Sequence, residues 1–144
     1  MASENWQDEL VSESDYLQLA RLQVELPWRI DHGQCSRVHE LFTDDGRLSV
    51  GVDLVGRQAI LDWGREWDEK QPMPGLIHLA SNQRFVYDGP DQAKGTVFQT
   101  AYLVNDDGHA ATVPFAVGED QDTFVRTPNG WRFTSRVWTD LFTR

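Results

Sequence analysis

The period of the hydrophobic pattern changes once along this chain, and that change constrains the fold more than any other feature. Up to about Lys70 the apolar residues recur at helical spacing, whereas from Leu76 onward they alternate with polar residues. Four segments alternate in this way: 76–87, 93–104, 110–125 and 131–138. Between them lie the turn sequences Asp88-Gly89-Pro90-Asp91, Asn105-Asp106-Asp107-Gly108 and Thr127-Pro128-Asn129-Gly130. Helices followed by an antiparallel meander are therefore expected, which is an α+β arrangement.

Three helices are expected before the sheet. The first begins at Ser12 or Ser14 and carries a broad apolar face as far as residue 31, with Pro27 predicting a kink or break near residues 24–27. A short second helix over 35–42 ends at an Asp-Asp-Gly turn, and short strands are expected over 47–50 and 52–55. A third helix opens at Gly56 and ends in a charged stretch near residue 70.

Strands as long as these must coil strongly, and Pro114 within one of them predicts a bulge or an edge position. A strongly curved antiparallel sheet enclosed by three N-terminal helices makes a cone-shaped α+β barrel with an internal cavity. With 144 residues the chain suits one domain. We expect residues 1–12 to be disordered or extended and residues 13–144 to form that domain.

The net charge and the single cysteine argue against several classes of protein. A formal net charge of −10 without a basic stripe opposes nucleic-acid and membrane binding. Cys35 is the single cysteine, which fits a reducing, cytoplasmic location, and the acidic N-terminus does not resemble a signal peptide. The sequence shows no phosphate-binding glycine motif and no metal-binding histidine pair, so no cofactor and no metal are expected.

Asp31 and His78 are the candidate catalytic residues, because each places one ionisable group within an apolar pattern. If the fold joins them, the result is a carboxylate–imidazole pair suited to proton transfer. Two structural alternatives stay open. Asp31 would cap the second helix near Gly33, and His78 would be a buried strand histidine bonded to a backbone carbonyl.

Further candidates concern the cavity wall. Asn82 shares strand parity with His78, so its amide would either orient a carbonyl or hydroxyl group or be structural. Arg84 and Arg136 would contact a ligand or form salt bridges on the strand surface. The aromatic candidates, which serve either the cavity wall or plain core packing, are Trp28, Phe98, Tyr102, Phe115 and Trp138. Together they favour an apolar or aromatic ligand of steroid, terpenoid or polyketide size.

Six short motifs, in this order, resemble the SnoaL-like branch of the nuclear transport factor 2-like superfamily, and they extend over nearly the whole chain. Each motif is weak alone, and their joint order and spacing carry the resemblance. They are Ile30-Asp31-His32-Gly33, Glu40-Leu41-Phe42-Thr43-Asp44-Asp45-Gly46, Val55-Gly56-Arg57-Gln58-Ala59-Ile60, His78-Leu79-Ala80-Ser81-Asn82, Asp122-Thr123-Phe124-Val125-Arg126-Thr127 and Gly130-Trp131-Arg132-Phe133.

Within this branch the chain is similar to scytalone dehydratase, hexachlorocyclohexane dehydrochlorinase and the bile acid 7-dehydratases, in which Asp31 and His78 occupy matching positions. The resemblance implies a cofactor-independent lyase or isomerase acting on a hydrophobic small molecule. His78 would abstract a C–H proton while Asp31 fixes the ring tautomer. Those enzymes also use a polarising tyrosine. Leu26 stands at its first-helix position, and Tyr102 is the best available substitute.

The same resemblance implies other functions. The superfamily contains non-catalytic ligand-binding and structural modules, as well as epoxide hydrolases and polyketide cyclase-like enzymes. Epoxide hydrolysis implies an Asp–Arg–Asp constellation, which the sequence does not locate. Relatives assemble through the open face of the sheet, so a homodimer or homotrimer is expected.

Overall fold

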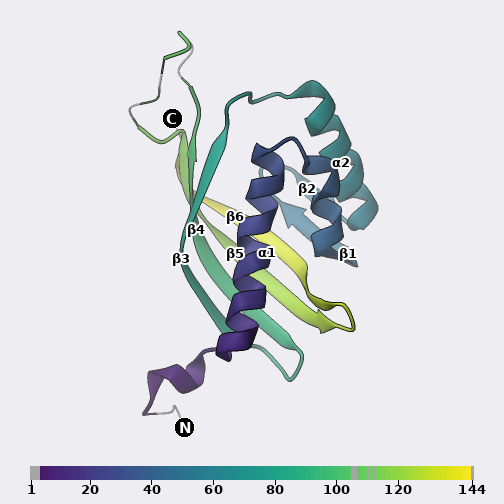
Figure 1. Ribbon diagram of the computed structural model, residues 1–144, viewed down its shortest axis with the longest axis vertical. Coiled ribbons are helices and arrows are strands. Elements are labelled where there is room, and N and C mark those ends of the chain that lie inside the picture. Colours follow the sequence, from purple (N-terminus) through teal and green to yellow (C-terminus); the bar gives the residue numbers. More distant parts are fainter. Residues whose placement is uncertain (1–3, 105–106, 110, 112, 144) are drawn as a thin grey trace.

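The computed structural model describes residues 4–104, 107–109, 111 and 113–143, and the chain folds into helices packed on a curved sheet (Figure 1). The N-terminal elements are η1 (Trp6–Glu9), α1 (Glu13–Asp31), η2 (Cys35–Leu41), β1 (Phe42–Ser49), β2 (Asp53–Val55) and α2 (Arg57–Lys70). The meander that follows consists of β3 (Ile77–Tyr87), β4 (Gln92–Tyr102), β5 (Ala116–Thr127) and β6 (Gly130–Thr143). This is the expected α+β class, with helices first and strands after them.

The helix α1 begins at its serine cap and runs without a break to Asp31. The Ser12 side chain accepts a hydrogen bond from the main-chain N–H of Asp15, which satisfies one of the free donors of the first turn. Pro27 lies inside the helix. Of the kink or break expected near Pro27, the break is therefore absent from α1: a proline removes one helical hydrogen bond, and the flanking residues stay helical.

The sheet is curved, as expected, and open: its strand order is β2-β1-β6-β5-β4-β3, so β2 and β3 are free edges among the described residues. It departs from expectation in one way. The strand β1 pairs with β6 in parallel, which makes the sheet mixed instead of purely antiparallel. The periodicity of a strand does not specify its partner, and the paired residues of these two strands lie 88 to 91 positions apart along the chain.

Several boundaries also differ from those expected. The described part of the fifth strand begins at Ala116, so Pro114 precedes the strand and does not interrupt it. The expected strand start at residue 110 and the turn residues 105–106 lie outside the described residues. Residues 6–9, within the segment expected to be extended or disordered, form the short helix η1.

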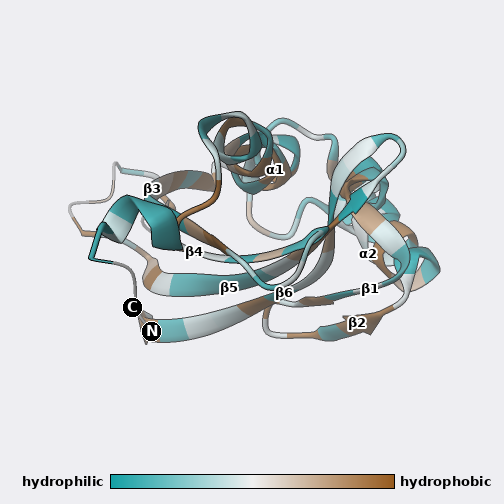
Figure 2. Cartoon of the chain, turned by 90° about the horizontal axis from the view of Figure 1, so that it is seen from below, coloured by the Kyte–Doolittle hydropathy of each residue, from teal (hydrophilic) through white to brown (hydrophobic). Residues whose placement is uncertain are grey.

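Both long helices lie on the same side of the sheet (Figure 2). Beneath α1 the core is aromatic: Phe133 packs between Phe42 and Phe124, at ring-centroid distances of 5.0 and 4.9 Å, and Phe85 contacts Phe124. The core fills one part of the space between helices and sheet and leaves the other part open for a cavity. None of the described helices combines the length and the apolar composition needed to cross a bilayer.

Candidate active site

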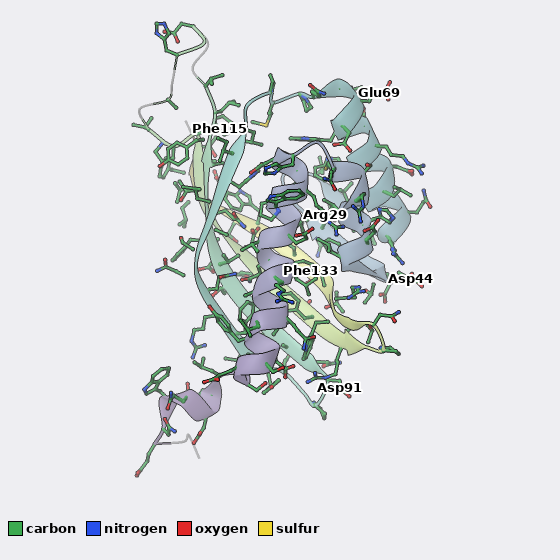
Figure 3. The ribbon with its side chains drawn as sticks, viewed as in Figure 1. Arg29, Asp44, Glu69, Asp91, Phe115 and Phe133 are labelled. Carbon is green, nitrogen blue, oxygen red and sulfur yellow. The ribbon has the colours of Figure 1, made fainter. Side chains whose placement is uncertain are left out.

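A cavity of about 500 Å³ lies between the helices and the concave face of the sheet. This volume is within the range of ordinary small-molecule sites. Phe115, one of its wall residues, lies well away from the core residue Phe133 (Figure 3). Most of the wall is apolar: Leu26, Pro27, Ile30, Leu48, Val50, Trp63, Trp67, Met73, Leu76, Ala101, Phe115, Ala116 and Trp138. Four polar side chains of the wall come from four successive sheet neighbours: His78, Gln99, Asp120 and Arg136.

Asp31 and His78 are in direct contact. Oδ1 of Asp31 lies 2.6 Å from Nδ1 of His78, and Oδ2 accepts the main-chain N–H of His78 at 2.8 Å. A carboxylate only accepts hydrogen bonds, so Nδ1 carries the ring proton when the imidazole is neutral. The unprotonated Nε2 is then left on a ring that lines the cavity.

The two structural alternatives are not what the structure contains. Asp31 is the last residue of α1, where the helix dipole disfavours a carboxylate. The start of η2 is capped by Asp68 of α2, whose carboxylate accepts the main-chain N–H groups of Cys35 and Ser36 at 2.9 and 2.8 Å. His78 likewise bonds to the Asp31 carboxylate.

A second polar cluster lies on β5 and β6 and was not located from the sequence. Nε and Nη2 of Arg136 donate to the two carboxylate oxygens of Asp122, each at 2.8 Å, and Nη1 lies 3.2 Å from Asp120. All three side chains are buried. This corrects the interpretation of Arg136 as a surface salt-bridge residue, whereas Arg84 is exposed and lies 3.7 Å from Glu9. Acidic residues at alternate positions of a buried strand, Asp120 and Asp122, are the pattern that could have revealed the cluster.

Burial and charge act differently on the members of this cluster. Burial raises the pKa of Asp120, although the nearby Arg136 opposes that shift. Burial also works against the charge of Arg136, but Asp120 and Asp122 together raise the pKa of the guanidinium, which stays charged. Arg136 is neutralised by its bidentate partner Asp122, and Asp120 is the surplus acid on the cavity wall.

The aromatic candidates divide between the cavity and other places. Phe115 and Trp138 line the cavity. Phe98 and Tyr102 lie on the opposite face of β4, because inward positions in that strand are the odd-numbered ones. Trp28 is half-exposed and stacks on His32, with ring centroids 4.1 Å apart. These three positions are corrections to the expected cavity wall.

Asn82 also lies outside the cavity, although it has the parity of His78. A bulge between Ser81 and Arg84 inserts an extra residue into β3, and Asn82 occupies it with a φ of 57°. The side chain that points inward there is that of Gln83, which donates to Gln23 of α1 at 3.0 Å. Parity counted along the sequence cannot anticipate such a shift.

The described residues contain no group of three or more His, Cys, Asp and Glu side chains arranged to hold a metal ion. What the cavity offers chemically is the imidazole of His78, the carboxamide of Gln99, the guanidinium of Arg136 and the carboxyl group of Asp120, set in mainly apolar walls. Asp140 and Thr143 of β6 add a second carboxyl group and a hydroxyl group.

The sequence profile of the SnoaL-like domain matches residues 12–137. The chain belongs to the SnoaL-like domain family. Several solved structures have a fold similar to that of this chain. An NTF2-like protein with a cystatin-like fold from Novosphingobium aromaticivorans has 24% sequence identity and a TM-score of 0.73, over 89% of this chain and 82% of that protein.

Two further structures are similar. A candidate scytalone dehydratase from Novosphingobium aromaticivorans has 18% identity and a TM-score of 0.74, over 91% of this chain and 87% of that one. A protein from Catenulispora acidiphila, solved in complex with S-DNPA, has 19% identity and a TM-score of 0.70, over 90% and 95% of the two chains. At such low sequence identities these similarities show a shared fold and not a shared activity. Among curated protein sequences, none matches this chain significantly.

Proposed function

We propose that this protein is a cofactor-independent lyase or isomerase, in which His78 removes a C–H proton from an apolar small molecule. The observation that carries the proposal is the Asp31–His78 pair at the cavity wall, joined through Nδ1 at 2.6 Å. Histidine suits the role because its ordinary pKa lies close to neutral pH.

In the elimination, Nε2 of His78 takes a proton from a carbon atom of the substrate. The C–H electron pair forms a new C=C bond, and hydroxide or halide leaves from the neighbouring carbon with its own electron pair. Asp31 stabilises the imidazolium while the proton is held, and the apolar walls strengthen that attraction by excluding water. Return of the proton to a different carbon, without loss of a group, makes the same reaction an isomerisation.

The base can be tested without knowledge of the natural substrate. In 5-nitrobenzisoxazole, removal of the C–H proton breaks the N–O bond and releases a coloured cyanophenolate. We expect the protein to accelerate this reaction well beyond free imidazole, His78→Ala to lose the acceleration, and His109→Ala, at an exposed histidine, to keep it. Equal rates for wild type and His78→Ala, or no acceleration by the wild type, would overturn the proposal.

A second candidate function, epoxide hydrolysis, is favoured by the Asp120–Arg136–Asp122 cluster. It ranks second because Asp120 and Arg136 line the cavity whereas Asp122 does not, so a ligand meets one carboxyl group of the pair. Hydrolysis of cyclohexene oxide that depends on Asp120 and not on His78 would make this the better description. The third alternative, a binding module without chemistry, predicts that neither residue affects any turnover.

The expected ligand and assembly are also part of the proposal. The mainly apolar wall supports a hydrophobic small molecule. We further propose a homodimer or homotrimer formed through the outer face of the sheet, where exposed Leu79 and Phe142 lie in one row with Thr100 and Val117 across four paired strands. A cytoplasmic location stays a prediction from the sequence.

A further inference from the structure

A second hollow, which we call the α1 groove, lies outside the active-site cavity. It is bounded by Gln18, Arg21 and Glu25 of α1, by Leu41 of η2 and by Arg132 just after the turn between β5 and β6, and its volume is about 370 Å³. Among the described residues, none lines both the groove and the cavity. The groove is large enough for a small molecule of its own.

Two arginines of the α1 groove have no acidic partner. Among the described Lys and Arg side chains, those that form no ion pair are Arg21, Arg65, Lys94 and Arg132. Arg21 and Arg132 both line this groove. In a chain with a net charge of −10, acidic partners are plentiful, so two unpaired arginines at one hollow indicate a site for an anion.

The acid that lines the groove does not neutralise these arginines. Glu25 lies one helical turn after Arg21, but its carboxylate bonds Nε of Arg29 at 3.0 Å. Glu40 in turn lies 3.1 Å from both Arg29 and Arg37. These two acids and two arginines balance one another. The positive charges of Arg21 and Arg132 are therefore left over at the groove.

The guanidinium of Arg132 is held beside the β5–β6 turn. Its Nη1 donates to the main-chain oxygen of Trp131 at 2.8 Å. Gly130, with a φ of 98°, leaves space next to that guanidinium: a Cβ atom there would lie 3.7 Å from Nη1 of Arg132 and 3.8 Å from Oε1 of Gln18. The glycine thus lets the amide of Gln18 and the guanidinium of Arg132 approach the same point of the turn.

The groove also has an apolar part. Leu22 and Leu41 line it and are only 8% and 7% exposed, and the buried Trp131 lies with them. Arg21, by contrast, is exposed. Buried apolar side chains beside exposed guanidinium groups suit a ligand that has an apolar body and an anionic end.

We propose that the α1 groove binds a phosphate monoester of an apolar alcohol, with the phosphate group at Arg21 and Arg132 and the apolar group against Leu22 and Leu41. A phosphate monoester carries a charge of about −1.5 to −2 at neutral pH, which matches two guanidinium groups better than a carboxylate does. Guanidinium N–H groups also fit phosphate oxygens well, since one arginine can donate to two of them. This site is separate from the active-site cavity and does not depend on the function proposed for it.

Phenyl phosphate is the probe, and nitrogen-15 NMR shows where it binds. The main-chain amide of Gly130 reports on the α1 groove, and the ring of His78 reports on the cavity. We expect phenyl phosphate to shift the Gly130 resonance saturably at concentrations that leave the His78 ring unchanged. Arg21→Gln and Arg132→Gln should each weaken this binding about tenfold or more, because each removes a charge-assisted hydrogen bond.

The matched control is Arg65→Gln, at an exposed and unpaired arginine of α2 outside the groove, which should leave the affinity unchanged. Benzoate, with a single charge, and inorganic phosphate, without an apolar group, should both bind more weakly than phenyl phosphate. Equal or tighter binding of either one overturns the choice of ligand. An unmoved Gly130 resonance, an unchanged affinity in Arg21→Gln, or an equal loss in Arg65→Gln overturns the site. The exposed position of Arg21 on α1 keeps this test available even if Arg132→Gln fails to fold.

Discussion

Asp31 divides its carboxylate between the ring and the main chain of His78, so its two oxygens fix both the orientation of the imidazole and its position on β3. An amide in its place can accept only through one atom, and its NH₂ group would meet an N–H donor. The residue thus positions the base and also stabilises its charged form.

We predict that Asp31→Asn lowers kcat for 5-nitrobenzisoxazole by about 10²- to 10⁴-fold, with a much smaller change in KM. Steady-state kinetics measure both constants. The matched control is Asp44→Asn, whose side chain is 97% exposed. A rise in KM with kcat unchanged would show that Asp31 serves binding and not proton transfer.

The residues of the site were predictable to different degrees. The pairing of Asp31 with His78 follows from two ionisable groups in apolar patterns together with the family resemblance. Asn82 was expected in the cavity from its strand parity, but a bulge in β3 turns it away. Phe98 was expected there from its aromatic character, but it lies on the outer face of β4. Arg136 was missed because an arginine in a strand is usually a surface residue.

The side chain of Asp15 joins α1 to the strands β3, β5 and β6. Its carboxylate accepts hydrogen bonds from Arg126 at 2.9 and 3.0 Å, from the Trp131 indole at 3.0 Å and from the Tyr87 hydroxyl. Arg126 above all holds the pKa of this carboxyl well below its ordinary value, against the opposing effect of burial.

A carboxyl group whose pKa is lowered by folding stabilises the folded state above its unfolded pKa, about 4, and loses that contribution as the pH falls further. We therefore predict that Asp15→Asn lowers the free energy of unfolding at pH 7 by about 1–3 kcal/mol. We also expect the acid-side loss of stability below pH 4 to be shallower in this variant. Urea titrations across pH measure both effects. Asp91→Asn, at an exposed aspartate that also bonds Arg126, should change stability little, and an equal effect of the two variants would contradict this account.

The packing of α2 against η2 depends on Gly64. A Cβ atom at this buried position would lie 2.2 Å from the main-chain oxygen of Cys35, which cannot move independently of η2. We predict that Gly64→Ala lowers the free energy of unfolding by about 1–3 kcal/mol, despite the better helix propensity of alanine. Thermal denaturation measures the loss, and Gly33→Ala serves as the reference. A Cβ atom at Gly33 meets no neighbouring atom among the described residues, so the cost of that variant comes from its left-handed φ of 71° and not from a steric clash. Unchanged stability of Gly64→Ala would show that the two elements separate without cost.

Elements with a clear period were predictable from the sequence, and their partners were not. The helices and the four meander strands follow from the apolar pattern and the turn residues. The parallel pairing of β1 with β6 could not be predicted from the sequence, because the hydrophobic pattern of either strand would be the same beside a different partner. The continuous helix through Pro27 reflects packing of the flanking residues, which outweighs the local preference.

For the whole molecule, the outer face of the sheet carries the proposed assembly. Paired neighbours Leu79, Thr100, Val117 and Phe142 form a row across β3 to β6, and Leu79 and Phe142 are 54% and 49% exposed. We predict that Leu79→Arg produces monomers from an oligomeric wild type, because a charge there would be buried without a partner. Sedimentation velocity measures the state. Leu17→Arg, at an exposed leucine of α1, should not alter it, and a monomeric wild type would contradict the prediction.

The role of His78 as an oriented base is tested most directly by the protonation of its ring. Nitrogen-15 NMR distinguishes a protonated from an unprotonated ring nitrogen, and the spectrum of His78→Gln identifies the His78 resonances among the four histidines. At a pH where the ring is neutral, the account predicts a proton on Nδ1 and a bare Nε2, with loss of this single tautomer in Asp31→Ala. A proton found mainly on Nε2, or a tautomer that does not change in Asp31→Ala, would contradict it.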